Sequence, residues 1–422
     1  MTSSQKLAVI VGQGYVGLPV AMRAAEVGYR VVGLDVDQRR VDALRRGESY
    51  VDDISSATLS DAMQSGRYTP SDDYADAEGF DVAVITVPTP LSEGNPDLTY
   101  IEESARALSG RLARGATVIL ESTTYPGTTE ELLVPILEEG SGLTAGQDFH
   151  VGYSPERIDP GNKTWGFVNT PKVVSGIDPE SLAQVQGFYD DLVERTVPVS
   201  GTKEAELTKL LENTFRHVNI ALVNELAIFG HQLGVDVWES IEAASSKPFG
   251  FMKFTPGPGV GGHCLPVDPS YLSWQVRRKL GQSFRFVELA NDINDHMPDY
   301  VAQRLMVLLN RAGKALNGSR VVLVGLSYKR NTGDIRESPS LRLIDVLKDL
   351  GTQIVGIDDR VEDHRWPAGV ERAPYAAETL ADADAIVLVT DHEEFDLALL
   401  ANSTVPVLDT KNRVNGPAVE RL

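Results

Sequence analysis

Three glycines near the N-terminus have the spacing of a phosphate-binding turn. Gly12, Gly14 and Gly17 directly follow a short apolar run at residues 6–11. A helical segment begins after them. Glycines at this spacing permit a tight turn and a close approach of the backbone to a pyrophosphate at a helix N-terminus. The pattern predicts a dinucleotide site in a strand–turn–helix–strand unit.

A carboxylate completes this unit. Asp35 ends the next apolar run, where it can hold the ribose hydroxyls of NAD. A carboxylate here favours NAD over NADP, whereas the neighbouring Arg39 and Arg40 leave NADP open.

Cys264 is the only cysteine, and it lies in a loop rich in glycine and proline at residues 247–270. Asp268 follows four residues later. A nucleophilic thiol needs access and a positive neighbour that lowers its pKa from about 8.5. Lys209 is a candidate for that neighbour. Free cysteines are more often small buried apolar residues, so the pattern alone leaves both interpretations open.

Lys209 and Asn213 stand four residues apart in a long helical segment, so they share one helix face. A lysine and an amide side by side could stabilise a developing oxyanion. A solvated polar stripe is the alternative, and the pattern alone slightly favours it.

Composition excludes several classes of protein. The 422 residues carry 39 Lys and Arg against 60 Asp and Glu, a formal net charge of −21. This charge argues against a general nucleic-acid binder and against binding to an anionic membrane surface. One cysteine excludes an intramolecular disulfide, and the seven histidines lack metal-site spacing, so no metal is expected. Without a signal-peptide pattern or a membrane-length apolar run, we expect a soluble cytoplasmic protein.

Alternating strand and helix patterns predict an α/β protein. We expect two Rossmann-like doubly wound domains, joined by a central helical domain with one long helix. The predicted boundaries are 1–200, 201–312 and 313–422. The third region repeats the architecture of the first, but the turn at 325–329 lacks the second and third glycines. We therefore do not expect it to bind a dinucleotide in the same manner.

The long helix, at residues 202–234, carries apolar residues around much of its circumference. A helix of this length and character is usually buried between domains or subunits. The pattern predicts a homodimer through the central region.

Five separated motifs, in order along the chain, resemble the UDP-glucose/GDP-mannose dehydrogenase family of nucleotide-sugar 6-dehydrogenases. The motifs are ESTTYPGT at 121–128, YSPER at 153–157, EAELTKLLEN at 204–213, GPGVGGHCLPVDP at 257–269 and YKRNTGDIRES at 328–338. The resemblance covers essentially the whole chain. Its details are most similar to the UDP-N-acetylglucosamine 6-dehydrogenase branch.

The resemblance implies a four-electron oxidation of the C6 alcohol of a nucleotide-diphosphate hexose to a uronic acid, with NAD as the oxidant. Cys264 would attack the C6 aldehyde to give a thiohemiacetal and then a thioester, which water hydrolyses. Lys209 and Asn213 would stabilise oxyanions. Asp268 would activate water or relay protons with Lys209.

Further roles are carried over from the same motifs. Glu156 matches a carboxylate implicated in thioester formation or hydrolysis, and Thr123 matches a hydroxyl that orders water. Glucose-specific relatives carry a second Glu shortly after the first, and Asp159 is the nearest candidate for it here. His263 is expected to have a structural role rather than to abstract a proton.

The resemblance also implies the binding residues. Those for the cofactor are Gly12, Gly14, Tyr15, Val16, Gly17, Asp35, Thr86, Pro88, Thr89, Thr123 and Arg336. Those for the substrate are Glu156, Arg157, Lys209, Asn213, Phe254, Gly261 and Lys329. Lys329 and Arg336 are expected to meet phosphate groups.

Several alternatives stay open. UDP-glucose, dTDP-glucose and UDP-N-acetylmannosamine are related substrates, and the acid product could feed a surface polysaccharide or a glycosylated small molecule. A two-electron dehydrogenase would need no thiol and would leave the second α/β domain unexplained. A non-catalytic NAD- or nucleotide-sugar-binding protein would be expected to lack one of the catalytic side chains.

Overall fold

The computed structural model describes residues 5–51, 53–92, 95–158, 162, 164–262, 265 and 267–422. The chain forms two compact units. The first unit comprises Met1–Glu212 and Trp274–Gly281, and the second comprises Asn213–Ser273 and Gln282–Leu422. Cys264, His263 and Asp159 lie outside the described residues.

The first unit is built on an eight-stranded sheet with the order β10-β9-β8-β7-β4-β1-β2-β3. The strands are β1 (Leu7–Val11), β2 (Arg30–Leu34), β3 (Tyr68–Ser71), β4 (Val82–Ile85), β7 (Thr117–Leu120), β8 (His150–Tyr153), β9 (Lys172–Gly176) and β10 (Thr196–Pro198). Strand β1 pairs with β2 on one side and with β4 on the other. The strand order therefore reverses at β1, and open α/β sheets bind ligands outside the carboxyl ends of the strands at such a point.

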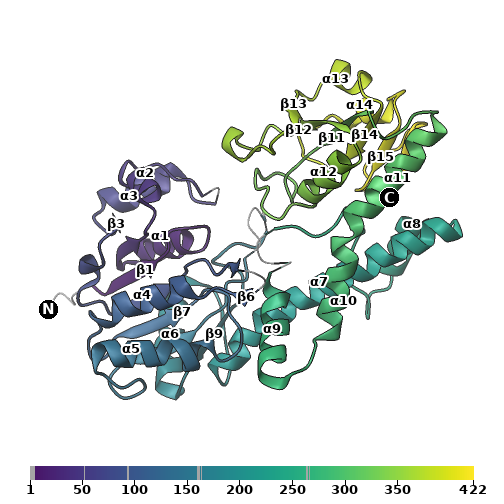
Figure 1. Ribbon diagram of the computed structural model, residues 1–422. Coiled ribbons are helices and arrows are strands. Elements are labelled where there is room, and N and C mark those ends of the chain that lie inside the picture. The colour runs from purple at the N-terminus through teal and green to yellow at the C-terminus, as the bar shows by residue number, and fades with distance from the viewer. Residues whose placement is uncertain are drawn as a thin grey trace. The chain divides into compact units, whose positions relative to one another are not determined.

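Helices connect and cover these strands (Figure 1). They are α1 (Gly17–Val27), α2 (Gln38–Arg45), α3 (Ser56–Gln64), η1 (Tyr74–Ala77), α4 (Thr99–Ser109), η2 (Thr129–Leu133), α5 (Val134–Ser141) and α6 (Pro179–Leu192). A two-stranded ribbon, β5 (Leu91–Ser92) with β6 (Asn95–Pro96), follows β4.

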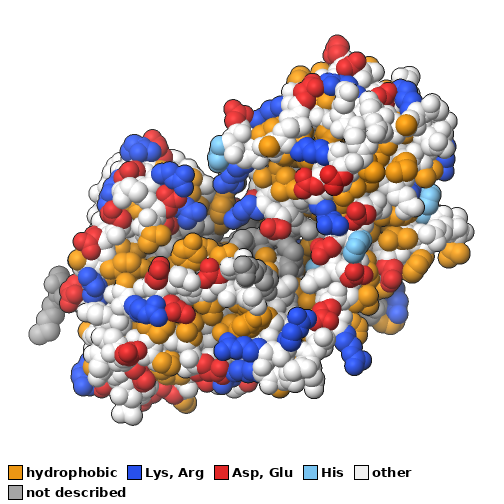
Figure 2. All heavy atoms as spheres, viewed as in Figure 1, with side chains coloured by type: hydrophobic (Ala, Val, Ile, Leu, Met, Phe, Trp, Pro, Cys, Tyr) orange, Lys and Arg blue, Asp and Glu red, His pale blue; other side chains and the backbone are white. Residues whose placement is uncertain are grey.

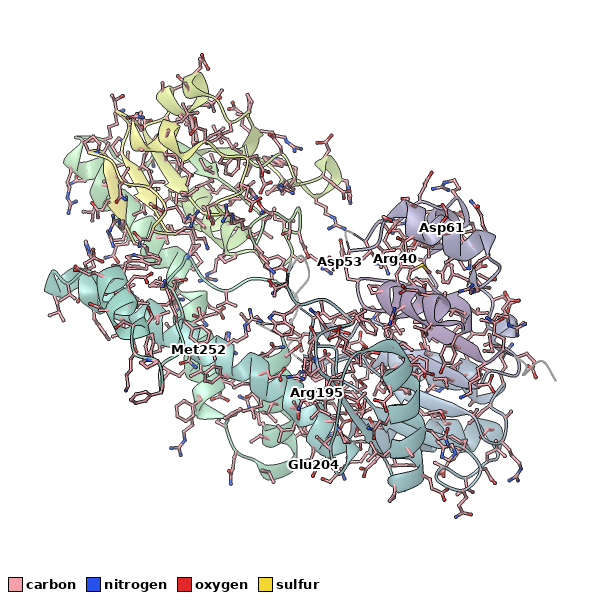
Figure 3. The ribbon with its side chains drawn as sticks, turned by 180° about the vertical axis from the view of Figure 1, so that it is seen from behind. Arg40, Asp53, Asp61, Arg195, Glu204 and Met252 are labelled. Atoms are coloured by element: carbon pink, nitrogen blue, oxygen red, sulfur yellow. The ribbon has the colours of Figure 1, made fainter. Side chains whose placement is uncertain are left out.

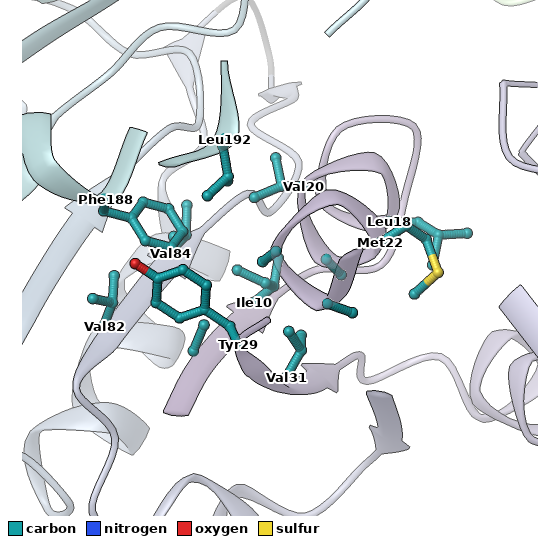
Figure 4. Packing of buried hydrophobic residues seen from close by; sticks show 14 of the residues in the cluster. Ile10, Leu18, Val20, Met22, Tyr29, Val31, Val82, Val84, Phe188 and Leu192 are labelled. Carbon is teal, nitrogen blue, oxygen red and sulfur yellow. The ribbon is translucent and has the colours of Figure 1, made fainter. Parts of the chain in front are cut away.

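Helices α1 and α6 pack on the strands through one apolar cluster (Figure 4). Ile10 on β1 and Val84 on β4 are fully buried there, together with Leu18 on α1. Tyr29 and Phe188 meet edge to face with ring centroids 5.5 Å apart. This core fixes the first βαβ unit, which carries the glycine turn.

One strand pair departs from the expected parallel pattern. Strand β9 pairs antiparallel with β8, whereas the other neighbouring pairs of this sheet are parallel. No helix is assigned among the described residues between β8 and β9, and an antiparallel return does not need a crossover helix. Gly152 faces Gly176 in this pair, and both glycines lie close to neighbouring backbone.

The second unit contains a six-stranded parallel sheet with the order β13-β12-β11-β14-β15-β16. Its strands are β11 (Arg320–Val324), β12 (Gln353–Ile357), β13 (Glu371–Arg372), β14 (Ala385–Leu388), β15 (Val407–Asp409) and β16 (Val419–Arg421). Its helices are α8 (Val237–Ser245), α10 (Arg285–Asp295), α11 (Met297–Arg311), α12 (Pro339–Asp349), η3 (Asp363–Arg365), α13 (Ala377–Ala381) and α14 (Leu397–Ala401), and α9 (Asp268–Leu280) lies partly in each unit.

Asp358 follows β12 as Asp35 follows β2, but its surroundings differ. Asp358 is fully buried, and its Oδ2 accepts hydrogen bonds from the backbone N–H groups of Leu326 and Ser327 at 2.8 and 3.0 Å. His392 Nε2 lies 3.1 Å from the same oxygen. This carboxylate holds the turn after β11 and is closed to a ribose, which supports the prediction that the turn does not bind a dinucleotide as the first one does.

The expected long helix is confirmed. Helix α7 (Thr202–Leu233) has 32 residues, and at about 1.5 Å per residue it is about 48 Å long (Figure 1). It passes from the first unit into the second between Glu212 and Asn213. Among the described helices, none combines the length and apolar character needed to cross a bilayer.

The close packing at Gly152 gives a stability prediction. A Cβ at Gly152 would overlap Ser175 O on β9. We expect Gly152→Ala to lower the free energy of unfolding by about 1–3 kcal/mol, measured by urea denaturation. Gly187→Ala is the control, because a Cβ at this helical position has open space, so it should be neutral or stabilise by up to about 1 kcal/mol. An equal effect of the two changes would contradict this packing.

Candidate functional site

The three glycines of the first turn have three different physical roles. Gly12 has φ +90°, and a Cβ there would lie 2.8 Å from Thr86 O. A Cβ at Gly17 would overlap Gly12 O, so this glycine allows α1 to approach the turn. Gly14 differs, because a Cβ there would have no protein atom within 4 Å among the described residues. The backbone at Gly14 therefore faces open space, as pyrophosphate binding requires.

The start of α1 suits an anion. Val16 precedes the helix and supplies no side-chain cap to its first turn. The predicted residues Tyr15 and Val16 therefore lie at a helix N-terminus, where the helix dipole favours a phosphate. The residues present fit the pyrophosphate of a dinucleotide.

Asp35 lies beside this turn and is 8% exposed. Its Oδ2 accepts from Gln13 N at 2.8 Å, and its Oδ1 accepts from Asp37 N at 2.9 Å. Arg40 (Figure 3) lies 3.4 Å from Asp35, and Arg39 pairs with Asp37 at 3.0 Å. Both arginines that left NADP open are thus paired with carboxylates. Asp35 Oδ1 accepts from Asp37 N and so has a second lone pair for a ribose hydroxyl, whereas Oδ2 accepts from both Gln13 N and Arg40.

Gln13 is a supporting residue that sequence reasoning missed. It is fully buried, and its Nε2 donates to Ile10 O at 2.8 Å. Tyr68 donates to its side-chain oxygen at 2.8 Å, and Tyr50 donates to its main-chain oxygen at 2.6 Å. A side chain at Gly33 would collide with the Gln13 amide, so this glycine makes room for the network. Its position inside the glycine motif was the one available signal.

The other predicted cofactor residues of this unit follow β4 and β7. Thr86 donates from its hydroxyl to Val11 O and Gly12 O, both at 2.8 Å, and so connects β4 to the glycine turn. Pro88 is exposed and Thr89 is buried in the segment that follows. Thr123 lies half-buried just beyond β7. The carboxyl ends of β1, β2, β4 and β7 thus carry these residues on one edge of the sheet.

Glu156 lies three residues beyond β8 and is 8% exposed. Its Oε1 accepts from Arg157 N at 2.7 Å and Ile158 N at 2.6 Å, and its Oε2 lies 3.2 Å from Lys172 Nζ. Burial alone would raise the pKa of Glu156, but Lys172, these hydrogen bonds and Lys209 hold it below its ordinary value. The charge of Lys209 thus acts on Glu156, and Glu156 is held as a carboxylate.

Two contacts to α7 were not foreseen. The Arg157 guanidinium forms a bidentate pair with Glu212 on α7, at 2.5 and 3.2 Å, and also donates to Pro171 O. The buried Glu206 accepts from Gly127 N at 2.5 Å and from Thr129 N at 2.8 Å. Burial raises the pKa of Glu206 to about 7. These contacts fix the segments that carry Thr123 and Glu156 relative to the helix that carries Lys209.

In the second unit, Asn213 Nδ2 donates to Asp268 Oδ2 at 2.6 Å. Asn213 lies one turn beyond Lys209 on α7, and Asp268 is the first residue of α9 and 2% exposed. The structure therefore brings Asn213 and Asp268 together directly. Cys264, four residues before Asp268, lies outside the described residues.

A buried amide network holds the first residue of the motif at 257–269, which contains Cys264 and is called the cysteine loop below. Gly257 N donates to Asn224 Oδ1 at 2.9 Å, and Asn224 Nδ2 donates to Asn294 Oδ1 at 2.9 Å. Both asparagines are buried. Sequence reasoning missed them, because a single Asn on an amphipathic helix has no signal beyond its polarity.

The end of the described loop packs on the segment that carries Lys329 and Arg336. A Cβ at Gly261 would lie 2.7 Å from Glu337 O, and Gly262 N donates to Arg336 O at 3.3 Å. Gly261 therefore has a packing role in addition to its predicted contact with substrate. The two elements implied to hold the sugar and the phosphates are in contact within one unit.

The remaining predicted residues of this unit are partly accessible. Lys329 is half-buried. Arg336 is exposed and pairs with Asp334 through contacts of 2.6–3.0 Å. Phe254 packs edge to face on Phe215 of α7, with ring centroids 5.8 Å apart. Phe254 thus has a structural contact besides its predicted role.

On the face drawn in Figure 2, acidic and basic side chains are interspersed. No group of three or more potential ligands for a metal ion was found among the described His, Asp and Glu side chains.

Comparison with known protein families covers most of the chain. Residues 6–193 match the NAD binding domain of the UDP-glucose/GDP-mannose dehydrogenase family. Residues 203–296 match the family's central domain, and residues 322–416 match its UDP binding domain. The order of the three matches is that of the motifs in the sequence.

Individual relatives are similar over nearly their whole length. A UDP-N-acetyl-D-glucosamine 6-dehydrogenase from Pseudomonas aeruginosa is 37% identical, over 92% of this chain and 90% of the relative. A UDP-N-acetyl-D-mannosamine dehydrogenase from Pyrococcus horikoshii is 35% identical, over 92% and 89%. A solved structure of a UDP-D-ManNAc dehydrogenase from Pyrococcus horikoshii superposes with a TM-score of 0.89 and 33% identity, covering 98% of each chain.

The open space at Gly14 gives a binding prediction. Gly14→Ala should leave the melting temperature unchanged and raise the Kd for NAD by about tenfold or more, measured by isothermal titration calorimetry, because the methyl group occupies the pyrophosphate's space. Gly110→Ala is the control, since a Cβ there also meets no atom, and it should leave the Kd unchanged. Unaltered NAD binding by the Gly14 variant would refute this placement.

Proposed function

The chain belongs to the UDP-glucose/GDP-mannose dehydrogenase family and is an NAD-dependent nucleotide-sugar dehydrogenase, and we propose that it oxidises UDP-N-acetylglucosamine at C6 to the uronate. The proposed route is a four-electron oxidation through a thiohemiacetal and a thioester at Cys264. The observation that carries it is the Asn213–Asp268 hydrogen bond. Asp268 lies four residues after Cys264, and Asn213 lies one helical turn after Lys209.

The side chains have complementary roles in this route. Lys209 and the Asn213 amide stabilise negative charge on the substrate oxygen. Asp268 accepts from Asn213 and so orients its amide group. NAD, when bound, accepts the hydride in each of the two oxidations. The Cys264 thiolate attacks the C6 aldehyde, and a thioester, unlike the ester a serine would form, is readily hydrolysed.

Glu156 is proposed to act in the hydrolytic step. Its carboxylate is held ionised by Lys172 and by two backbone N–H groups. A fixed carboxylate can orient a water molecule and accept its proton as the carbonyl carbon is attacked. Thr123, just beyond β7, is proposed to help order that water.

The choice of sugar rests on two similarities. The motifs resemble the UDP-N-acetylglucosamine branch, and the relative from Pseudomonas aeruginosa named for that sugar is 37% identical. The relative from Pyrococcus horikoshii, named for UDP-N-acetyl-D-mannosamine, is 35% identical. Both relatives are named for sugars with an acetamido group. We therefore propose a pocket that accepts a 2-acetamido sugar, and UDP-N-acetylmannosamine is the main alternative substrate.

The three-domain organisation is also part of the proposal. We assign NAD binding to residues 1–200, the cysteine loop and subunit contacts to 201–312, and nucleotide-sugar binding to 313–422. Lys329 and Arg336 belong to the last region, where their charges suit a diphosphate.

Reaction stoichiometry tests the route. With wild type we expect two NADH per sugar consumed, and uronate as the product, with UDP-N-acetylglucosamine turned over fastest in a panel of nucleotide sugars. Cys264→Ala should bind NAD with unchanged affinity and form no uronate, because no acyl-enzyme can form. NADH absorbance with chromatography of the sugars measures both. One NADH per sugar, or uronate formation by the variant, would refute the thioester route.

We propose that a second copy of the chain covers one face of α7. Large apolar side chains recur along that face at intervals of three, four or seven residues, and each is at least 41% exposed. They are Leu207, Leu211, Phe215, Leu222, Leu226, Phe229 and Leu233. A continuous exposed apolar stripe marks an interaction surface. A homodimer would bury it.

Charge placed in this stripe tests the dimer. Wild type should have a dimer mass in light scattering at micromolar concentration, and Leu226→Glu should shift it toward monomer, because the interface would bury an unpaired carboxylate. Arg216→Glu, exposed on α7 outside the stripe, should leave the dimer intact. A monomeric wild type would contradict the proposal.

A further inference from the structure

Four buried polar side chains surround one point at the edge of the first unit's sheet. Glu121 follows β7, Lys172 begins β9 and Tyr189 lies on α6. Lys172 Nζ pairs with Glu121 Oε1 and lies 3.2 Å from Glu156 Oε2. Tyr189 donates its hydroxyl to Glu121 Oε2 at 2.6 Å. The cluster thus connects a second carboxylate to Glu156 through one ammonium group.

Strand pairing explains why these residues meet. Tyr153 of β8 lies opposite Ser175 of β9 in an antiparallel register. Continuing that register by three residues places Glu156 opposite Lys172. Because β9 runs against β8, its first residue lies at the edge where β7 and β8 end. The motifs of the sequence analysis contained Glu121 without giving it a role.

The cluster holds more negative than positive charge when both carboxylates are ionised. Glu121, Glu156 and the Lys172 ammonium leave a net charge of −1 among groups at most 8% exposed. Lys209 offsets the charge of Glu156, so the carboxylate that lacks an ammonium of its own is Glu121, and an incompletely compensated buried charge is costly. One added proton makes the group neutral. Burial raises the pKa of Glu121 to about 7, although Lys172 opposes this, while Lys172 keeps the pKa of Glu156 low.

The surroundings decide which carboxyl carries the proton. Glu156 faces Lys172 and the positive charge of Lys209, and it accepts from the backbone N–H groups of Arg157 and Ile158. Glu121 faces Lys172, the Tyr189 hydroxyl and the Glu156 carboxylate, whose negative charge disfavours ionisation of Glu121. Because the two environments differ in this way, Glu156 is the ionised carboxyl of the pair and Glu121 is the one that takes up a proton.

Glu156 is the most accessible side chain of the cluster. Glu121 is 1% exposed, Lys172 is 4% exposed and Tyr189 is fully buried, whereas Glu156 is 8% exposed. Glu156 is therefore the member best placed to exchange a proton with a bound molecule. The Glu121 and Glu156 carboxyls also lie within hydrogen-bonding range of one another.

We propose that Glu121 is the proton store for the acid-forming step, positioned by Lys172 and Tyr189 and reached through Glu156. This inference rests on the proposed function. As water attacks the thioester carbon, the C–O bond forms, the C–S bond breaks and Cys264 leaves as the thiolate. One proton of the water passes to the Glu156 carboxylate and from there to the Glu121 carboxylate, and the acid formed gives its remaining proton to the thiolate. Glu156 returns to its ionised form, Lys172 keeps its charge, and the proton leaves by the same path after the acid is released.

The test compares wild type with Glu121→Gln and Tyr189→Phe in stopped-flow NADH measurements over a range of pH. In wild type, steady-state turnover should rise with pH through about 7, because Glu121 must be ionised to accept a proton. Glu121→Gln should keep the rapid first NADH burst and lose tenfold or more in steady-state turnover. Tyr189→Phe should move the acid limb up by about one pH unit, because ionised Glu121 loses a hydrogen bond.

Several outcomes would overturn the proton store. They are an unchanged pH profile in Glu121→Gln, an equal slowing of burst and steady state, or an unmoved acid limb in Tyr189→Phe. If Glu121→Gln does not fold, Tyr189→Phe alone decides. A wild type that forms one NADH per sugar refutes the proposed function instead, and the proton store with it.

A second readout needs no substrate and separates the two failures. Infrared difference spectra between about pH 5 and pH 9 should show carboxyls that ionise near pH 7 in wild type, from Glu121 and Glu206, and the Glu121 contribution should be missing in Glu121→Gln. Glu131→Gln, at an exposed carboxylate of the same unit, should keep this signal. Identical spectra for wild type and Glu121→Gln would overturn the proton store whatever the enzyme oxidises.

Discussion

The antiparallel pairing of β8 with β9 is the constraint on which the acid-forming part of the site depends. A parallel β9 would begin at the opposite edge of the sheet, far from the carboxyl ends of β7 and β8. The observed pairing places Lys172 against both Glu121 and Glu156. The direction of β9 thus supplies Lys172 as the positive partner of the buried Glu156 carboxylate, on which Lys209 also acts. Gly152 and Gly176, which face one another in this pair, show that the backbone packing here leaves no room for side chains.

Helix α7 carries two further proposed site residues, Lys209 and Asn213. Glu206 and Glu212 connect it to the segments after β7 and β8, and Lys209 lies between these two anchors. One turn farther, Asn213 meets Asp268, and Asn224 holds the start of the cysteine loop. Residues of the proposed mechanism are therefore spaced along one helix, with Lys209 in the first unit and Asn213 in the second. Its exposed apolar stripe is the surface that the proposed second subunit would cover.

Sequence patterns predicted the local features well. The glycine turn, Asp35 and the long helix each depend on neighbours within a few turns, and such periodic patterns are legible in one sequence. The pairings across the fold were not predictable in this way. Glu121 and Lys172 are 51 residues apart, and Glu206 is 79 residues from Gly127. Their contacts follow from strand direction and sheet register, which neither composition nor local spacing encodes. Asp35 was predicted as a ribose ligand, whereas its hydrogen bond to the glycine turn appears only in three dimensions.

A covalent acyl intermediate at Cys264, hydrolysed with the help of Glu156 and Glu121, is the central claim. Mass spectrometry of protein quenched in acid during turnover of UDP-N-acetylglucosamine with NAD tests it directly. The account predicts that the peptide containing Cys264 carries the nucleotide-linked uronyl group, and that Glu121→Gln accumulates more of this adduct than wild type. Uronate formation with an unmodified Cys264 peptide in both proteins would contradict it.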